Sequence, residues 1–281
     1  MSWVLNVSKV VTHLDLSYNS LQHSIPDGFA NMISHLQYLH LSFNELDELL
    51  DLSSNPFSRG SLPDFSSLSS LNTLSLANTN IVGELSFGHL PDHLEALDLS
   101  FNQLSGSMPS FDVGKLASLQ ELDLSNNQLN GTLPINIGQL SNLVRLSITS
   151  NKLNGVINES HLSNLSKLEY LQVSQNSLSF DFSSNWVPPF QLTYLYTTSC
   201  ILGPKFPAWI KHQRELTALQ ISNSGISDSF PEWFWNLSLS LLYLNVSHNQ
   251  LIGTLSKSLL HMKTRPWSVW DLRSIFPLSI K

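Results

Sequence analysis

The sequence predicts a repeat solenoid of the α/β type, in which a short strand from each coil joins one parallel sheet. Three observations predict this class. An asparagine, or a small residue in its place, recurs every 23 to 25 residues along most of the 281-residue chain. Leucines precede this marker residue at fixed spacings, and a segment of the form Gly-x-apolar-Pro follows it in several units. Regularity on this scale indicates stacked structural repeats.

The segment from Leu116 to Ile148 shows the unit clearly. Its sequence is "LASLQELDLSNNQLNGTLPINIGQLSNLVRLSI", with leucines spaced three, two and five apart from Leu119 to Leu129. This spacing fits neither a helix nor a long alternating strand. It does fit the leucine-rich pattern L-x-x-L-x-L-x-x-N/C-x-L. The marker positions are Asn19, Asn44, Asn55, Thr79, Asn102, Asn127, Asn151, Asn176, Cys200, Ser224 and Asn249.

Each part of the unit has an expected place in the coil. Leu122 and Leu124 alternate with polar residues, which predicts a short strand with its leucines buried between coils. Such strands would pair in parallel at ~4.8 Å spacing and form the concave sheet of a right-handed horseshoe arc. The marker amide would bond backbone groups at the turn. After "GTLP" at Gly131 to Pro134, we expect mostly loop and short 3-10 or helical segments on the convex side.

The pattern assigns about ten repeats to residues 1–255 and predicts two irregular regions. Between Asn44 and Asn55 the step is only 11 residues, too short for a complete coil of 20 or more residues. We therefore expect a fault in the sheet or a bulging loop over residues 45–60. Residues 256–281 lack the repeat spacing and are predicted to be a separate tail.

Composition and motifs exclude several classes of function. Only 12% of the residues are charged and the formal net charge is −7, which argues against nucleic acid or an anionic membrane as a partner. One cysteine permits no internal disulfide. We find no catalytic, metal or nucleotide motif and expect a non-enzyme without cofactors. The printed sequence shows no signal peptide and no apolar run of membrane-spanning length.

The sequence resembles the extracellular leucine-rich repeats of plants, whose units carry an L-x-G-x-I-P segment. The stretches "FSSNWVPPFQLTYL", "CILGPKFPAWI", "SNSGISDSFPEWFWNLS" and "LNVSHNQLIGTL" look more narrowly like plant receptor-like proteins of the ethylene-inducing xylanase receptor type. The resemblance implies a sensor on the extracellular side of the plasma membrane in defence or development. It also implies a co-receptor kinase as a partner, and it implies flanking cysteine pairs and a membrane anchor that this chain does not show.

Departures from the repeat pattern identify the candidate binding residues. In four successive repeats the central outward strand position holds Ser147, Gln172, Tyr196 and Gln220 instead of the usual aspartate. Aromatic, arginine and amide side chains side by side suit a protein or peptide ligand. The other interpretation is that exposed tyrosines simply favour strands. The candidate residues are Arg145, Tyr170, Gln172, Gln175, Tyr194, Tyr196, Gln220 and Tyr243.

Six N-x-Ser/Thr sequons predict N-glycosylation if the chain enters the secretory pathway. They lie at Asn6, Asn130, Asn158, Asn164, Asn236 and Asn245. Asn245 is exceptional because it falls on the predicted concave face, where a glycan would block a partner.

Three functional hypotheses follow from the sequence. The first is a fragment of a plant receptor-like ectodomain that binds a protein or peptide. The second is a soluble extracellular inhibitor of a microbial cell-wall-degrading enzyme, similar to polygalacturonase-inhibiting proteins. The third is a truncated product without an independent function, which the irregular step and the odd tail would fit.

Overall fold

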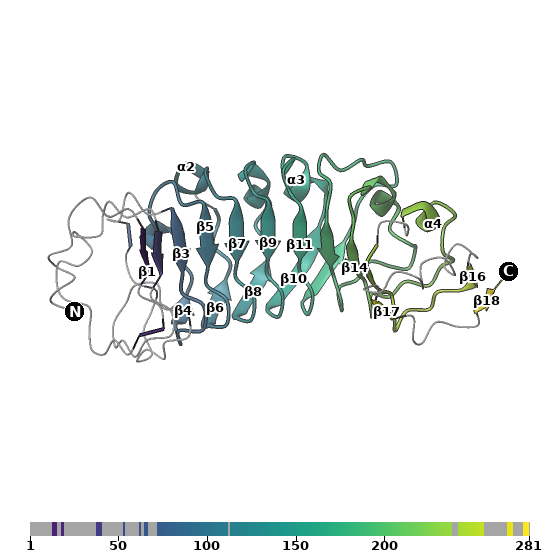
Figure 1. Ribbon diagram of the computed structural model, residues 1–281, viewed down its shortest axis with the longest axis horizontal. Helices are drawn as coiled ribbons and strands as arrows, with labels where there is room; N and C mark the ends of the chain where they lie inside the picture. The colour runs from purple at the N-terminus through teal and green to yellow at the C-terminus, as the bar shows by residue number, and fades with distance from the viewer. Residues whose placement is uncertain are drawn as a thin grey trace, which may run out of the picture.

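In the computed structural model the chain forms a solenoid of stacked coils (Figure 1). The structure describes residues 13–15, 18–19, 38–40, 53, 62, 65–66, 72–111, 113–237, 241–255, 269–271 and 278–280. One strand per coil joins a parallel sheet of nine strands, which confirms the predicted fold. The strands of this large sheet are β3 (Thr73–Ser75), β5 (Ala96–Asp98), β7 (Glu121–Asp123), β9 (Arg145–Ser147), β11 (Tyr170–Gln172), β13 (Tyr194–Tyr196), β14 (Ala218–Gln220), β15 (Tyr243–Asn245) and β17 (Val269–Asp271).

The leucine spacing explains why these strands form and align. The central residue of each strand from β3 to β15 in this sheet is buried, and the register places Leu97 opposite Leu122 and Leu122 opposite Leu146. All three are at most 1% exposed, and they belong to one continuous core along the described coils. Burying a leucine side chain stabilises the fold by about 1.5–3 kcal/mol. A one-residue slip would turn these leucines outward, so the leucine column fixes the register.

The marker asparagines form a buried ladder between coils, as the sequence predicts. Asn127 is 8% exposed, and its Nδ2 donates to the carbonyl oxygens of Leu99, Leu124 and Ser125 at 2.9–3.2 Å. Its Oδ1 accepts the backbone N–H of Leu104 at 2.9 Å. Equivalent bonds recur at Asn102, Asn151, Asn176 and Asn249. One amide therefore satisfies backbone groups of two coils at a turn that would otherwise leave them unpaired.

Cys200 takes the marker position in its repeat and is buried. Its Sγ donates to the carbonyl oxygen of Val173 at 3.3 Å, and burial raises the pKa of the thiol to about 12. Because the thiolate is the reactive form, we expect the native protein to resist a thiol-specific reagent at mildly alkaline pH. The denatured protein should take up one equivalent. Stoichiometric labelling of the native protein within minutes would contradict this structural role.

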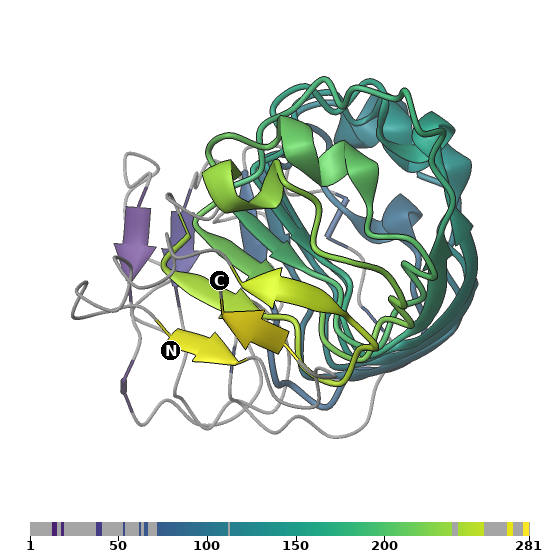
Figure 2. The same ribbon diagram turned by 90° about the vertical axis from the view of Figure 1, so that its right-hand side faces the viewer.

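A second parallel sheet is the main addition to the predicted fold. We predicted mostly loop after the marker turn, yet five of these segments pair as strands. They are β4 (Val82–Glu84), β6 (Gln103–Ser107), β8 (Gln128–Thr132), β10 (Lys152–Ile157) and β12 (Ser177–Phe180). The bridges Ser179–Ile201 and Ser229–Ile252 continue the same pairing into later coils. Figure 2, which looks along the solenoid, shows how the coils overlie one another.

Short helical turns complete the coils, as predicted. They line one edge of the solenoid in Figure 1, where α2, α3 and α4 are labelled. Their bounds are η2 (Phe87–His89), α2 (Val113–Leu116), η3 (Ile135–Gln139), α3 (Glu159–Leu162), η4 (Ala208–His212) and α4 (Phe234–Leu237). Among the described residues, none of these helices has the length and apolar character needed to cross a bilayer.

The structure describes the two regions that were predicted to be irregular, residues 45–60 and 256–281, to different extents. Most of residues 45–60 lie outside the described residues, so the short step stays a prediction; upstream of it, β1 (His13–Asp15) pairs with β2 (Tyr38–His40). Within the predicted tail, β17 joins the large sheet with Trp270 opposite Leu244. β18 (Leu278–Ile280) pairs with β16 (Gly253–Leu255). The parallel pairing of the repeats therefore continues at these strands, with Trp270 at the register position that leucine holds in β15.

Candidate binding face

The outward side chains of the large sheet form two columns, which together we call the binding face. The first column runs through Glu121, Arg145, Tyr170, Tyr194, Ala218 and Tyr243. The second runs through Asp98, Asp123, Ser147, Gln172, Tyr196, Gln220 and Asn245. Because the strands are parallel and in register, side chains spaced 24 or 25 residues apart in the sequence become neighbours in space.

In the first column, three predicted residues and Glu121 form a continuous series of contacts. The Nε of Arg145 lies 3.6 Å from Oε2 of Glu121, and its Cζ lies 4.0 Å from the ring centroid of Tyr170. The Tyr170 ring stacks on Tyr194, with centroids 4.9 Å apart and planes at 13°. The guanidinium is therefore held between a carboxylate and an aromatic face, a contact worth about 0.5–1 kcal/mol at an exposed site.

The aromatic contacts then cross to the second column. Tyr194 meets Tyr196 edge-on at 6.1 Å, and Tyr196 meets Tyr243 at 6.4 Å. Ala218 lies between Tyr194 and Tyr243 in the first column, and its small side chain leaves room for the last contact. We call Arg145, Tyr170, Tyr194, Tyr196 and Tyr243 the aromatic array. Its rings hold one another in place, so little side-chain entropy would be lost on binding.

The predicted glutamines lie beside this array, around a shallow hollow of about 430 Å³. Gln172, Gln175 and Gln220 line it together with Tyr196. Amide side chains offer both donors and acceptors, so the hollow can hydrogen-bond a polypeptide backbone. All eight predicted binding residues thus lie in the array or around the hollow.

Several residues of the hollow are not among the eight candidate binding residues. Asp123, Ser147 and Thr149 line it, and so does Phe101, which is 60% exposed. Phe101 precedes the marker asparagine and adopts a left-handed conformation with φ of 55°, as Asn126 and Gln175 do in later coils. This backbone conformation turns the side chain out of the coil at the edge of the sheet. A bulky apolar residue just before the marker was therefore an available signal.

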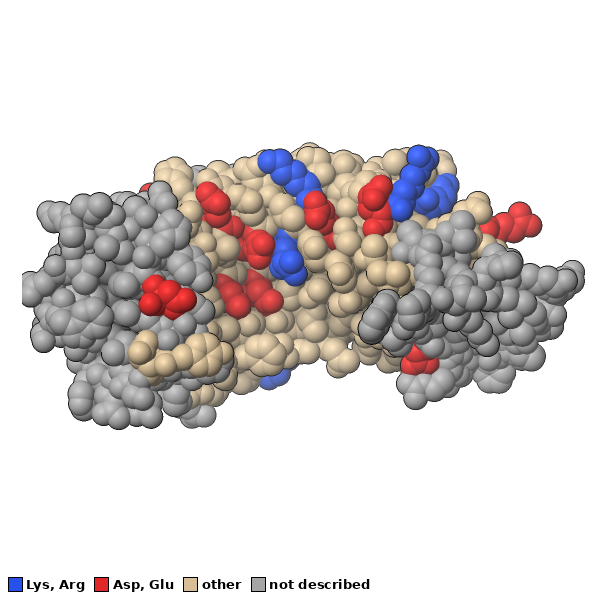
Figure 3. Space-filling model, in the orientation of Figure 1, with Lys and Arg blue, Asp and Glu red and all other residues tan. Residues whose placement is uncertain are grey.

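Charge is unevenly distributed over the binding face. In Figure 3 acidic side chains gather in the half nearer the N-terminus, and the adjoining stretch toward the C-terminus is mostly uncharged. Asp98 and Asp123 are opposite each other on β5 and β7. Burial raises the pKa of Asp98, the nearby charge of Asp123 adds to the increase, and hydrogen bonds from Ser100 reduce it. The binding face therefore has an acidic half and an uncharged aromatic half.

The raised pKa of Asp98 predicts how stability depends on pH. Because this pKa is higher in the folded than in the unfolded chain, the wild type gains stability as the pH falls through the folded-state value. In the wild type, Asp98 Oδ1 accepts the Ser100 N–H at 2.9 Å. The variant Asp98→Asn keeps an oxygen for this hydrogen bond but removes the negative charge. At neutral pH, urea titration should show the variant more stable by up to about 1 kcal/mol. The difference should shrink on acidification; a difference that grows would contradict the assignment.

Four sequons occupy exposed or partly exposed positions outside the binding face. Asn130 is exposed on β8, Asn164 is exposed, and Asn236 is exposed in α4. Asn158 is half-buried and caps α3, where its Oδ1 accepts the Ser160 N–H at 3.2 Å. Glycosylation at these four sites stays a prediction.

The remaining two sequons differ from this group. Asn245 lies on the binding face opposite Gln220, and its Oδ1 accepts bonds from the Ser247 N–H and hydroxyl. A glycan there would cover the C-terminal end of the aromatic array. Asn6 lies outside the described residues.

Among the residues that the structure describes, no His, Cys, Asp and Glu side chains gather in a group of three or more that could hold a metal ion.

Comparisons with known proteins agree with this geometry. Residues 4–229 match the leucine-rich repeat region family, and residues 240–262 match a further leucine-rich repeat. The chain is 50% identical over 100 residues to receptor-like protein EIX1 of Solanum lycopersicum, which covers 36% of this chain and 10% of that protein. The chain thus spans about a tenth of the length of this curated relative.

Two solved structures extend the likeness to nearly the whole chain. A TDR receptor superimposes with a TM-score of 0.81 at 26% identity, covering 99% of this chain and 49% of that one. The PEPR1–AtPEP1 structure superimposes with a TM-score of 0.77 at 28% identity, covering 96% of this chain and 39% of that one. These likenesses extend across both sheets described above.

Proposed function

Because the chain belongs to the leucine-rich repeat family, we propose that it is a ligand-recognition segment of a plant cell-surface receptor-like protein. Its ligand would be a protein or peptide, and it would act outside the plasma membrane in defence or development. A co-receptor kinase would carry the signal onward. The 50% identity to receptor-like protein EIX1 supports this class, and it covers only part of each chain.

One observation carries the proposal, namely the continuous aromatic array beside a polar hollow on the same face. A few rigid aromatic and arginine side chains supply most of the binding energy at protein interfaces. Here Tyr170 and Tyr194 are already stacked, and Arg145 is fixed over Tyr170. The neighbouring Gln172 and Gln220 can hydrogen-bond a backbone that crosses the strands. The mechanism is therefore recognition without covalent chemistry.

The acidic half of the binding face supports a ligand that carries positive charge at one end. Asp98, Asp123 and Glu121 lie on β5 and β7, next to the aromatic array, whose Arg145 pairs with Glu121. A basic residue over these carboxylates would raise the association rate and fix the direction of the ligand. An extended segment rises ~3.3 Å per residue while strands lie ~4.8 Å apart, so about ten residues could span seven strands.

The proposal is tested by binding and enzyme inhibition together. The chain would be immobilised and exposed to a displayed random-peptide library and to a purified fungal xylanase and polygalacturonase. We expect selected peptides or enzymes to bind the wild type and to lose affinity for a Y170A/Y194A/Y196A variant. Gln128, Asn154 and Val156 are exposed on the second sheet, so their triple alanine variant is the matched control.

The outcomes separate a sensor from an inhibitor. Binding of an enzyme that keeps its activity would support the sensor, whereas loss of that activity would favour the soluble inhibitor. Equal binding by the wild type and the tyrosine variant would contradict the proposed site. Failure to select any specific ligand would favour a product without an independent function.

A further inference from the structure

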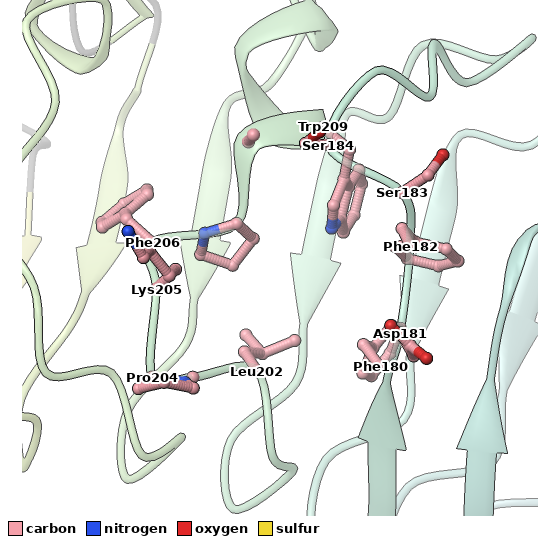
Figure 4. A pocket seen from close by; sticks show the side chains of 13 residues that line it. Phe180, Asp181, Phe182, Ser183, Ser184, Leu202, Pro204, Lys205, Phe206 and Trp209 are labelled. Carbon is pink, nitrogen blue, oxygen red and sulfur yellow. The ribbon is translucent and has the colours of Figure 1, made fainter.

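A second pocket lies away from the binding face, in the turn that follows β12. Figure 4 shows it between the segment that leaves Phe180 and the segment that leads into η4. Its volume is about 510 Å³, within the range of small-molecule sites. It shares no lining residue with the hollow of the binding face. Aromatic side chains, two serine hydroxyls, one carboxylate and one ammonium line it.

Both walls of this pocket are fixed by carboxylates that accept backbone hydrogen bonds. Glu159 Oε1 accepts the N–H of Ser183 at 2.6 Å, and Asp228 Oδ2 accepts the N–H of Phe206 at 3.0 Å. These bonds are the largest cause of the lowered pKa of each carboxyl group. Each bond ties one wall to a neighbouring coil, so both walls are held in place before any ligand arrives.

Trp209 supplies the observation that points to a ligand. Its side chain is 4% exposed and packs edge-on against Phe182, with centroids 5.5 Å apart. Among the described residues, none of the hydrogen bonds uses its indole N–H. Figure 4 shows the indole nitrogen directed into the pocket. The indole nitrogen is not among the buried unpartnered polar atoms of the described residues, so its N–H is free to bond water or an acceptor group of a ligand in the pocket.

The charges of the lining restrict the class of ligand. Asp181 and Lys205 are both exposed and line the pocket, so the lining carries one charge of each sign and no net charge that would favour an anion or a cation. A purely apolar group would leave the Trp209 N–H unsatisfied. The pocket instead suits a neutral ring with several hydroxyl groups and an apolar face. Its C–H bonds would pack on Phe182, and its hydroxyls would bond Trp209, Asp181 and the serines.

We propose that this pocket binds a neutral sugar unit in pyranose form. The sugar would come either from a free oligosaccharide or from a glycan attached to a protein, since both present the same ring. Gly203 lines the pocket and lets this wall pack closely on the next coil, because a Cβ there would collide with the carbonyl of Gly225. The site would work independently of the binding face, since the two have no residue in common.

The test follows the Trp209 indole resonance in a ¹H–¹⁵N spectrum of the whole chain labelled with ¹⁵N-tryptophan. The chain has seven tryptophans, and the variant W209F identifies the resonance by its loss. Cellotetraose, xylotetraose and chitotetraose would be titrated to millimolar concentration. We expect at least one to shift the Trp209 resonance. D181N should weaken that affinity about tenfold or more, because a hydrogen bond to a charged acceptor is lost.

Two further experiments distinguish a free oligosaccharide from a protein-borne glycan and test whether the sugar binds at this pocket alone. A glycoprotein with high-mannose glycans would be compared with the same protein after enzymatic removal of its glycans, and a shift caused only by the first identifies a protein-borne sugar. The Y194A variant on the binding face should bind the sugar like the wild type. The proposal is overturned if no saccharide or glycan shifts the resonance, or if D181N binds as tightly as the wild type.

Discussion

Replacing Asn127 with alanine is expected to lower the free energy of unfolding by about 3–4 kcal/mol. The change removes four buried hydrogen bonds, two to the preceding coil and two within the coil's own turn. The carbonyls of Leu99 and Leu124 keep a second partner, because Asn102 and Asn151 also donate to them. The backbone N–H of Leu104 keeps none among the described residues, so an unsatisfied buried donor accounts for much of the loss. Urea titration measures the effect.

Two matched variants make this expectation specific. Asn126→Gly changes the adjacent residue, whose φ of 55° glycine tolerates, and should stay within about 0.5 kcal/mol of the wild type. Asn127→Ser should fall between the two, because Ser224 holds the equivalent position with a single hydroxyl donor. Hydrogen exchange at the Leu104 amide should accelerate in N127A. A loss below about 1 kcal/mol in N127A would contradict a structural role for the ladder.

Replacing Tyr194 with alanine is expected to weaken the affinity for a selected peptide about 30-fold or more, equivalent to about 2 kcal/mol. Tyr194 is the central member of the array, since it stacks on Tyr170 and meets Tyr196 edge-on. Its loss removes contact area and frees both neighbouring rings. Titration calorimetry with the selected peptide measures the change.

The controls separate binding from folding. Tyr194→Phe keeps the ring contacts and should retain most of the affinity, whereas Val156→Ala changes an exposed residue of the second sheet and should have no effect. The thermal midpoint of Y194A should stay close to that of the wild type, because the side chain is only partly buried. Unchanged affinity in a folded Y194A would remove the array from the binding site.

The periodic features of the fold could be predicted from the sequence. Leu122, Leu146 and Leu171 recur at the coil repeat and are buried in register, so spacing alone predicted the large sheet. The ladder role of Asn127 followed from the same spacing. These predictions succeeded because each coil repeats one set of contacts with its neighbours.

The second sheet could not be predicted in the same way. β8 has the sequence QLNGT, in which Asn and Gly disfavour strands, and Gly131 has a φ of 74°. Its pairing with β6 and β10 arises only because stacked coils bring equivalent segments together. β17 was missed for another reason, since Trp270 replaces the expected leucine.

Of the two candidate sites, one could be predicted from the repeat spacing and the other could not. The aromatic array was predictable because its members occupy the two outward strand positions of the repeat, as Tyr170, Tyr194 and Tyr196 do. The pocket that contains Trp209 was not, because its lining comes from two irregular segments with no shared spacing. The Trp209 ring packs in the core, yet its indole N–H is directed into a cavity.

The central claim is that the large sheet presents the ligand-binding face, and site-specific photo-crosslinking tests it most directly. A photoreactive phenylalanine would replace Tyr196 beside the hollow in one protein and Val156 on the second sheet in another. With a selected peptide bound, we predict a crosslink from position 196 and none from position 156. A crosslink from position 156 alone would contradict the account and move the binding site to the second sheet.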